Sequence, residues 1–144
     1  MYFELSIVIK RPPEDVFVFL RDKDKHQQKN GSPVLVLEKT SDGPAGIGTC
    51  YREVVQMMPL IKGEIISKIT RFDPPNFLEE EFVGAGMTGH LAYQFLTDIN
   101  GTKLIQQQHI SFIGPLKLIH PIIRAILFRR LNARLQEIKT YLEN

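Results

Sequence analysis

The sequence predicts an α+β fold in which one long C-terminal helix covers an antiparallel sheet of six to seven strands. Three observations predict it. Residues 2–10 alternate between apolar and polar side chains, as a strand with one buried face does. Residues 34–112 contain six segments rich in β-branched and aromatic residues, joined by short turns that favour antiparallel pairing. Near the end of the chain, leucine and isoleucine recur at helical spacing.

A helix is predicted directly after the first strand. The stretch reads RPPEDVFVFLRD, and its run of five apolar residues alone would suit a strand as well as a helix. The proline pair and the two carboxylates ahead of it favour a helix, because proline suits the first helical turn and negative charge suits the N-terminal end. We expect a helix over residues 13–22. The polar stretch DKDKHQQKNG then predicts a loop or a short second helix.

The middle of the chain is predicted to consist of strands and turns. We expect strands at residues 34–40, 48–58, 61–72, 77–83, 87–97 and 102–112. After GPLK, the chain is predicted to be helical to its end. This segment carries one apolar stripe, formed by Leu127, Leu131, Leu135, Ile138 and Leu142. Pro121 lies near its start, where we expect a kink or a second helix start.

Length and charge limit the possible functions. A chain of 144 residues, with 43% hydrophobic and 24% charged residues, predicts a single globular domain over residues 1–144. The net charge of +2 is too small to indicate nucleic-acid binding. The basic residues also gather on the last helix without an aromatic platform for bases. We expect no nucleic-acid partner, and the sequence leaves monomer and homodimer both open.

Cysteine usage and the start of the chain predict the compartment. The single cysteine, Cys50, excludes an internal disulfide and a cysteine-based zinc cage, which fits a reducing compartment. The first residues contain neither a basic region before an apolar run nor a cleavage site, so we expect no signal peptide. No run of ~18 apolar residues predicts a membrane span. We expect a cytoplasmic protein without a metal or cofactor.

The stretch SDGPAGIGTCYRE contains three glycines, which raises the question of a phosphate-binding loop. Such a loop needs a helix after it, so that the helix N-terminus faces the anion. Here β-branched and aromatic residues follow, and the glycine spacing differs from the nucleotide-binding pattern. We therefore expect Gly43, Gly46 and Gly48 to be positive-φ or close-approach positions in a turn between strands.

The order of these pieces resembles the START/polyketide-cyclase-like (SRPBCC) superfamily, which has the helix-grip fold. The resemblance runs nearly end to end, through IVIKRPPEDVFVFLRD, GIGTCYRE, ITRFDPPNFLEEEF, NGTKL and the final helical segment. One departure is that many members have an aromatic residue, often tryptophan, just after the first helix. This chain reads KHQQKNG there and has no tryptophan.

The resemblance implies a curved sheet wrapped around the long helix, with a hydrophobic cavity between them. Members bind lipids, sterols, polyketides or plant hormones, and some are cyclases or dehydratases. We expect this chain to bind or carry a small hydrophobic molecule, and prefer this function to that of an enzyme. The alternatives are a cyclase or dehydratase, and a membrane-surface or partner-binding module that uses the basic C-terminal helix.

Turn positions predict which side chains face the cavity. A two-residue loop at Asn100–Gly101 sets Phe95 opposite Gln106, Tyr93 opposite Gln108 and Leu91 opposite Ile110. This face is the more apolar one, so we expect it to point inward. The DPPN turn sets Phe72 opposite Phe77, Ile69 opposite Glu80 and Ser67 opposite Phe82. A loop at Pro59–Leu60 then sets Cys50 opposite Ile69 and Arg52 opposite Ser67.

These registers predict a ligand-binding wall. We expect it to consist of Arg52, Val54, Ile65, Ile69, Glu80, Phe82, Leu91, Tyr93, Phe95, Gln106, Gln108, Ile110, Ile123 and Leu127. Arg52 and Glu80 would meet inside, where Arg52 would grip a ligand carboxylate or carbonyl and Glu80 would serve as a general base. The alternative is a structural ion pair. Tyr93, Gln106 and Gln108 are either ligand contacts or hydrogen-bonded core groups.

Two further features have competing interpretations. The four histidines do not predict a metal site, because His90 and His109 would be diagonal neighbours on the outer face without a third ligand. Cys50 has no histidine beside it and is expected to be a small buried residue. Ile119, Ile122, Ile123 and Ile126 spread beyond the apolar stripe of the last helix. We expect this half of the helix to be covered on two sides, and the alternative is a docking surface.

Overall fold

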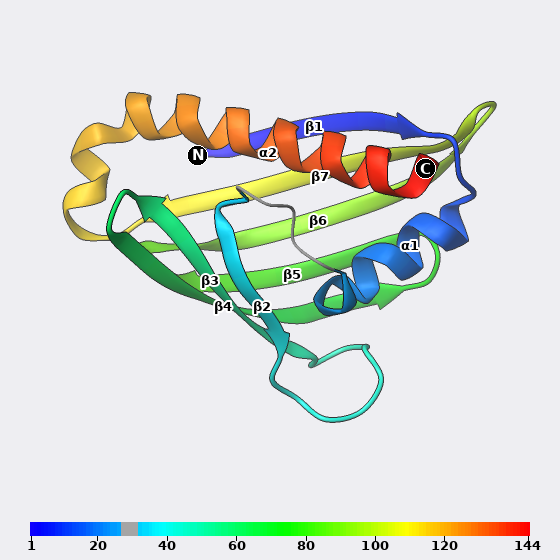
Figure 1. Ribbon diagram of the computed structural model, residues 1–144, viewed down its shortest axis with the longest axis horizontal. Coiled ribbons are helices and arrows are strands. Elements are labelled where there is room, and N and C mark those ends of the chain that lie inside the picture. The colour runs from blue at the N-terminus through cyan, green and yellow to red at the C-terminus, as the bar shows by residue number, and fades with distance from the viewer. Residues whose placement is uncertain (27–31) are drawn as a thin grey trace.

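The computed structural model describes residues 1–26 and 32–144, without the side chains of residues 116, 119 and 120 (Figure 1). Within these residues the chain forms one seven-stranded antiparallel sheet, in the order β1-β7-β6-β5-β4-β3-β2. Its strands are β1 (Tyr2–Ile9), β2 (Val34–Lys39), β3 (Cys50–Met58), β4 (Ile61–Asp73), β5 (Phe77–Gly84), β6 (Met87–Asp98) and β7 (Gly101–Phe112). The helices are α1 (Pro13–Arg21), the short 3₁₀ helices η1 (Lys23–Lys25) and η2 (Gly114–Ile119), and α2 (His120–Glu143).

The expected α+β helix-grip architecture is confirmed. The curved sheet wraps around α2, and α1 covers the end of the sheet near the C-terminus (Figure 1). Pro121 occupies the second residue of α2, so it marks the start of a helix and not a kink. η1 is the expected second short helix, and the rest of that polar stretch, residues 27–31, lies outside the described residues.

The core lies where β1, α1 and the second half of α2 meet over the middle of the sheet. The stripe predicted for α2 faces it: Leu135, Ile138 and Leu142 are buried, and Leu127 and Leu131 are partly buried. Further buried side chains are Phe3, Leu5, Ile9, Val16, Phe17, Leu20, Phe95 and Leu104. No helix in the described part of the chain is long and apolar enough to cross a bilayer.

The glycine-rich stretch is a turn that leads into a strand. Gly43 and Gly48 have φ angles of +83° and +88°, as predicted, and β3 follows where a phosphate loop needs a helix. The prediction was wrong for Gly46. Its φ is not positive, and a Cβ added there would meet no described atom within 4 Å.

The predicted register of β6 and β7 was wrong by two residues, but the predicted inward face was right. The loop consists of Ile99–Asn100, because Asp98 pairs with Gly101. Tyr93 consequently pairs with Gln106, and Phe95 pairs with Leu104. A shift of two residues keeps every side chain on the same face of a strand, since the side-chain period is two.

The register of β3 was wrong by one residue, which reverses its faces. Met58 pairs with Ile61 as expected, but a bulge between Gln56 and Met58 shifts the rest of β3. Arg52 therefore pairs with Ile66 and not with Ser67. Cys50, Arg52 and Val54 face outward, and Tyr51, Glu53 and Val55 face inward.

The register between β4 and β5 was predicted correctly over most of its length. Ile69 pairs with Glu80, and Ser67 pairs with Phe82. A bulge between Ile69 and Arg71 shifts the far end of the hairpin, so Phe72 pairs with Leu78 and not with Phe77. The inward position of Glu80 follows from the correctly predicted pair of Ile69 with Glu80.

Candidate functional site

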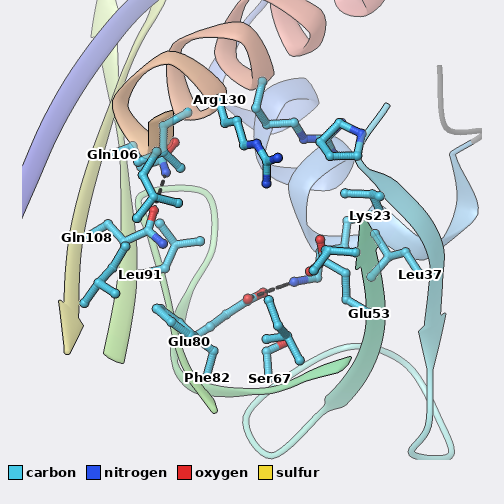
Figure 2. Close-up of a pocket in the computed structure, with 18 of the residues that line it drawn as sticks. Lys23, Leu37, Glu53, Ser67, Glu80, Phe82, Leu91, Gln106, Gln108 and Arg130 are labelled. Atoms are coloured by element: carbon cyan, nitrogen blue, oxygen red, sulfur yellow. Dashed lines mark hydrogen bonds and ion pairs between the residues drawn. The ribbon is translucent and has the colours of Figure 1, made fainter. Parts of the chain in front are cut away.

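A cavity of about 310 Å³ lies between the inner face of the sheet and α2 (Figure 2). Strands β2 to β7 contribute inward-facing side chains to it, because alternate residues share one face of a strand. Its apolar lining includes Leu37, Val55, Ile65, Phe82, Leu91, Ile110, Leu127 and Leu131. Its polar lining includes Lys23, Glu53, Ser67, Glu80, Tyr93, Gln106, Gln108, Arg130, Arg134 and Glu137.

Most of the expected ligand-binding residues lie in this wall. They are Ile65, Glu80, Phe82, Leu91, Tyr93, Gln106, Gln108, Ile110 and Leu127. Ile69 and Phe95 are buried in the adjoining core, and Ile123 packs against that core from α2, so none of the three lines the cavity. Arg52 and Val54 face away from it. The role of the lining residues in binding stays a prediction.

The predicted meeting of Arg52 with Glu80 inside the cavity is wrong. Arg52 lies on the outer face of the sheet, where its Nε is 2.6 Å from Glu64 Oε2 and its Nη1 is 3.1 Å from Glu38 Oε1. These carboxylates come from the strands on either side of β3. The cause is the β3 bulge, which turns Arg52 outward. Arg52 therefore forms surface ion pairs across strands.

Glu80 instead pairs with Lys23. The Glu80 side chain is only 5% exposed, and the Lys23 Nζ lies 2.9 Å from its Oε1 and 2.8 Å from its Oε2. η1 positions Lys23 directly after α1, and its Nζ also lies 4.5 Å from the centre of the Tyr51 ring. The Tyr51 hydroxyl donates to the Arg21 carbonyl at 2.8 Å. A buried carboxylate requires such a partner, since an isolated buried charge is costly.

Sequence reasoning missed Lys23, which lies in a polar stretch and 57 positions from Glu80. A charged residue in a hydrophilic segment normally predicts a solvated surface. The available signal was Glu80 itself. Once it is placed on the inward face, Glu80 either keeps its proton or has a cation nearby, and the residues just after α1 are candidates for that cation.

A second carboxyl group, Glu53, lines the cavity without a hydrogen bond or ion pair to any described residue. Burial raises the pKa of Glu53, the positive charge of Lys23 opposes this shift, and the negative charge of Glu80 adds to it. Glu53 therefore retains its proton to higher pH than an exposed glutamate does. The predicted register of β3, which turned Arg52 inward, implied that Glu53 faces outward.

The neutral polar groups of the cavity come from β6 and β7. The Gln106 Nε2 donates to the Gln108 Oε1 at 3.0 Å, which supports the interpretation of this pair as hydrogen-bonded core groups. The Gln106 Oε1 is buried without a partner among the described residues. The Tyr93 hydroxyl likewise forms no hydrogen bond within that part of the chain. Burial and the nearby Glu80 charge raise the pKa of Tyr93, so its hydroxyl stays protonated and can donate.

The cavity consequently has polar groups on two opposite walls and apolar side chains between them. Figure 2 shows the Gln106–Gln108 pair on one wall, and Lys23 and Glu53 on the opposite wall. α2 adds Arg134, whose Nη1 lies 3.6 Å from Glu137 Oε2. Apolar side chains such as Leu91 lie between the two ends (Figure 2). This arrangement can hold an apolar body and orient it by polar groups at both ends.

The histidines lie apart from this site. His90 and His109 are directly opposite one another on exposed positions of β6 and β7, and not diagonal as predicted. Among the described residues, no group of three or more His, Cys, Asp or Glu side chains is arranged to hold a metal ion. Cys50 is half-buried on the outer side of β3, so the expectation that it is a small buried residue was wrong.

The sequence matches one family along almost its entire length. The family described as "Polyketide cyclase / dehydrase and lipid transport" matches residues 2–143. No curated protein sequence matches the chain.

Several solved structures share the fold. Zhui aromatase/cyclase from Streptomyces sp. R1128 superposes with a TM-score of 0.80 at 14% identity, covering 99% of this chain and 93% of that one. A conserved protein from Geobacillus kaustophilus gives 0.78 at 15% identity, with 99% and 95% covered. The protein TTHA0849 from Thermus thermophilus gives 0.77 at 18% identity, with 99% and 97% covered. At these identities the similarity shows a common fold, and the activity in the first name is a property of that protein.

Proposed function

The chain belongs to the polyketide cyclase/dehydrase and lipid transport family, and from this we propose that it binds and carries a small, largely apolar molecule. The ligand would occupy the cavity between the sheet and α2. The observation that carries the proposal is the cavity itself: about 310 Å³, with aliphatic and aromatic side chains between two groups of polar residues. Ligand pockets in proteins have this size and combine an apolar wall with polar groups that orient the ligand.

The energetics of the wall favour an apolar ligand body. Removing apolar surface from water contributes roughly 25 cal/mol per Å². The side chains that would contribute this free energy include Phe82, Leu91, Ile110 and Leu127, from three strands and α2. The hydroxyl group of Tyr93 and the amide group of Gln108 would set the orientation of the ligand, since each can form a directional hydrogen bond.

The charged end of the cavity supports a carrier more than a catalyst. Lys23 contacts both oxygens of Glu80, so the predicted general base is held in an ion pair. Arg134 has Glu137 beside it on α2. An ion-paired Glu80 is not free to accept a proton, so this pair supports a fixed site and not a general base at Glu80.

Native mass spectrometry of the purified chain, followed by organic extraction, tests the proposal. We expect an additional mass of one small apolar molecule per chain, released by the solvent. Equilibration with a mixed lipid and aromatic extract extends the test to ligands that the expression host lacks. A chain that stays free of ligand after both treatments would contradict the carrier function.

One observation favours a second candidate function, acid–base catalysis of the cyclase or dehydrase type. Glu53 has a raised pKa, faces the cavity and has no partner among the described residues, which are the properties of a proton-transferring group. In this reading Glu53, and not Glu80, moves the proton. With a polyketide-type substrate, Glu53→Gln should keep binding but lose turnover. Absence of turnover by the wild-type chain would leave only the carrier function.

A further inference from the structure

The outer face of the first half of α2 is apolar and uncovered. Ile122 and Ile126 are 63% and 48% exposed, and Leu118 on the preceding η2 is 85% exposed. Together with Pro121, Ala125 and Arg129, the two isoleucines line a shallow groove on the helix surface. The expectation that this half of the helix is covered on two sides is therefore wrong. Only its inner face, with Ile123 and Leu127, packs against the core.

The second half of the same helix has an ordinary outer face. The exposed positions of residues 132–143 are the polar Asn132, Gln136 and Thr140, the small Ala133, and Tyr141, which has a hydroxyl group. A helix lying on a protein surface normally presents polar residues to water along its whole length. The change from polar to apolar midway along α2 marks its first half as a surface that contacts something other than water.

The turn between β3 and β4 extends this surface. Leu60 is fully exposed, and its φ angle of +67° is one that residues other than glycine and asparagine rarely adopt. Met58 and Ile61 beside it are also exposed. Arg130 of α2 donates from its Nη2 to the Met57 carbonyl at 3.3 Å, so the turn lies against the helix. Figure 1 shows both at the same end of the molecule, away from the C-terminus.

Positive charge surrounds these apolar side chains. Residues 113–133 contain Lys117, Arg124, Arg129 and Arg130, and no aspartate or glutamate. Lys62 follows the β3–β4 turn and is exposed. Arg124 reaches the β1 edge, where its Nη1 donates to the Tyr2 carbonyl at 3.2 Å. An apolar strip bordered by lysine and arginine is the surface that an interfacial, membrane-bound helix presents to lipid.

We propose that this end of the molecule docks onto an anionic lipid bilayer. The docking surface consists of Met58, Leu60, Ile61, Leu118, Ile122 and Ile126, with Lys62, Lys117 and Arg129 around it. The apolar side chains enter the boundary between headgroups and acyl chains, and the cations contact the lipid phosphates. A second copy of the chain fits less well. A two-fold contact through this face would bring the arginines of both chains together without any acidic residue from the same segment.

The docking surface and the cavity share one helix. Leu127, Leu131 and Arg134 of α2 line the cavity, while Ile122 and Ile126 lie on its outer side. Docking would thus bring a wall of the cavity to the bilayer, where an apolar ligand is most concentrated. The docking proposal stands on the surface alone and does not require that the cavity be occupied.

Vesicle co-sedimentation of the full chain tests the proposal. We expect binding to phosphatidylcholine vesicles containing about one third phosphatidylglycerol at about 50 mM salt. Binding to pure phosphatidylcholine should be at least about tenfold weaker, and about 500 mM salt should remove most of the difference. Equal binding to neutral and anionic vesicles, or no binding to either at low salt, would overturn the proposal.

A matched pair of variants locates the surface. Ile122→Asp removes an apolar contact and adds a negative charge, so we expect at least about a tenfold loss of binding to anionic vesicles. Ile99→Asp changes a residue of equal size and 98% exposure in the β6–β7 loop at the other end of the molecule, and should bind within about twofold of wild type. Equal losses of vesicle binding in the two variants would contradict the assignment of the docking surface to the face that contains Ile122.

Sedimentation velocity without lipid tests whether a second copy of the chain covers this surface in place of a bilayer. We expect a monomer at all concentrations used, for both wild type and Ile122→Asp. A wild-type dimer that Ile122→Asp dissociates would identify the surface as a self-association face and would overturn the proposal.

Discussion

Glu80 and Lys23 illustrate how one residue pair decides the chemistry of the cavity. Both oxygens of the buried carboxylate contact the ammonium group, and the Lys23 side chain is itself only 16% exposed. Removing one member of a buried pair leaves the other charge without compensation.

Glu80→Gln should lower the free energy of unfolding by about 2 kcal/mol or more, because Lys23 loses its counter-charge. Urea unfolding measures this difference. Glu81→Gln is the matched control, since Glu81 lies next in β5 and is exposed. We expect the control to stay within about 0.5 kcal/mol of wild type. A Glu80→Gln protein as stable as the control would show that the pair contributes little.

Glu53 provides a pH-dependent signature of the cavity. Its pKa is raised by burial above the ordinary glutamate value of 4.5, so the folded state prefers the protonated form. The stabilising contribution of the protonated group is complete below the unfolded-state pKa. It is lost as the pH rises through the higher folded-state pKa.

Glu53→Gln cannot ionise and should therefore gain stability relative to wild type as the pH rises from about 4 to about 7. Urea unfolding of both proteins at the two pH values measures the change in their difference. Glu81→Gln serves again as the exposed control, and its difference from wild type should change less. A Glu53→Gln protein that loses stability relative to wild type over this interval would mean that Glu53 is stabilised as a carboxylate.

At the scale of elements, the strands and helices follow from the sequence because period, turn residues and caps are local signals. The observed bounds of the strands differ from the predicted ones by at most two residues. The inward face of β6 and β7 was also predictable, since hydrophobic contrast between the two faces determines it. Tyr93, Gln106 and Gln108 were placed in the cavity wall on that basis.

The β3 bulge was not predictable from the sequence. One extra residue near Met57 reverses the faces of β3, yet QMMPL contains no proline or glycine within the strand to announce it. The errors at Arg52, Val54 and Glu53 all come from this one residue. Lys23 could not be assigned either, because its contact with Glu80 arises only when α1 packs over the end of the sheet.

The close packing of neighbouring strands can be tested at a glycine. Gly84 at the end of β5 has a φ of +137°, and a Cβ there would collide with the Glu64 carbonyl of β4. Gly84→Ala should destabilise the protein by about 2 kcal/mol or more, since the obstacle is backbone. Gly46→Ala meets no described atom within 4 Å and should be neutral or slightly stabilising. Equal stability of the two variants in thermal unfolding would contradict this picture of the sheet.

At the scale of the whole molecule, the sheet and α2 surround an apolar space that the core leaves open. The core is closely packed where β1, α1 and the second half of α2 meet, whereas the cavity lies beside the middle of α2, from Leu127 to Glu137. The first half of the helix has an uncovered apolar outer face. Binding and docking would thus use neighbouring parts of one helix.

The most direct test of the carrier function is a titration with the neutral fluorescent probe N-phenyl-1-naphthylamine. We compare wild type with Leu91→Trp, which places a large side chain in the cavity, and with Leu96→Trp on the exposed face of the same strand. We expect saturable binding of one probe per chain, weakened at least about tenfold by Leu91→Trp and within about twofold of wild type for Leu96→Trp. Circular dichroism establishes that both variants are folded. Wild-type affinity in a folded Leu91→Trp protein would show that the probe binds elsewhere and would contradict a carrier function of this cavity.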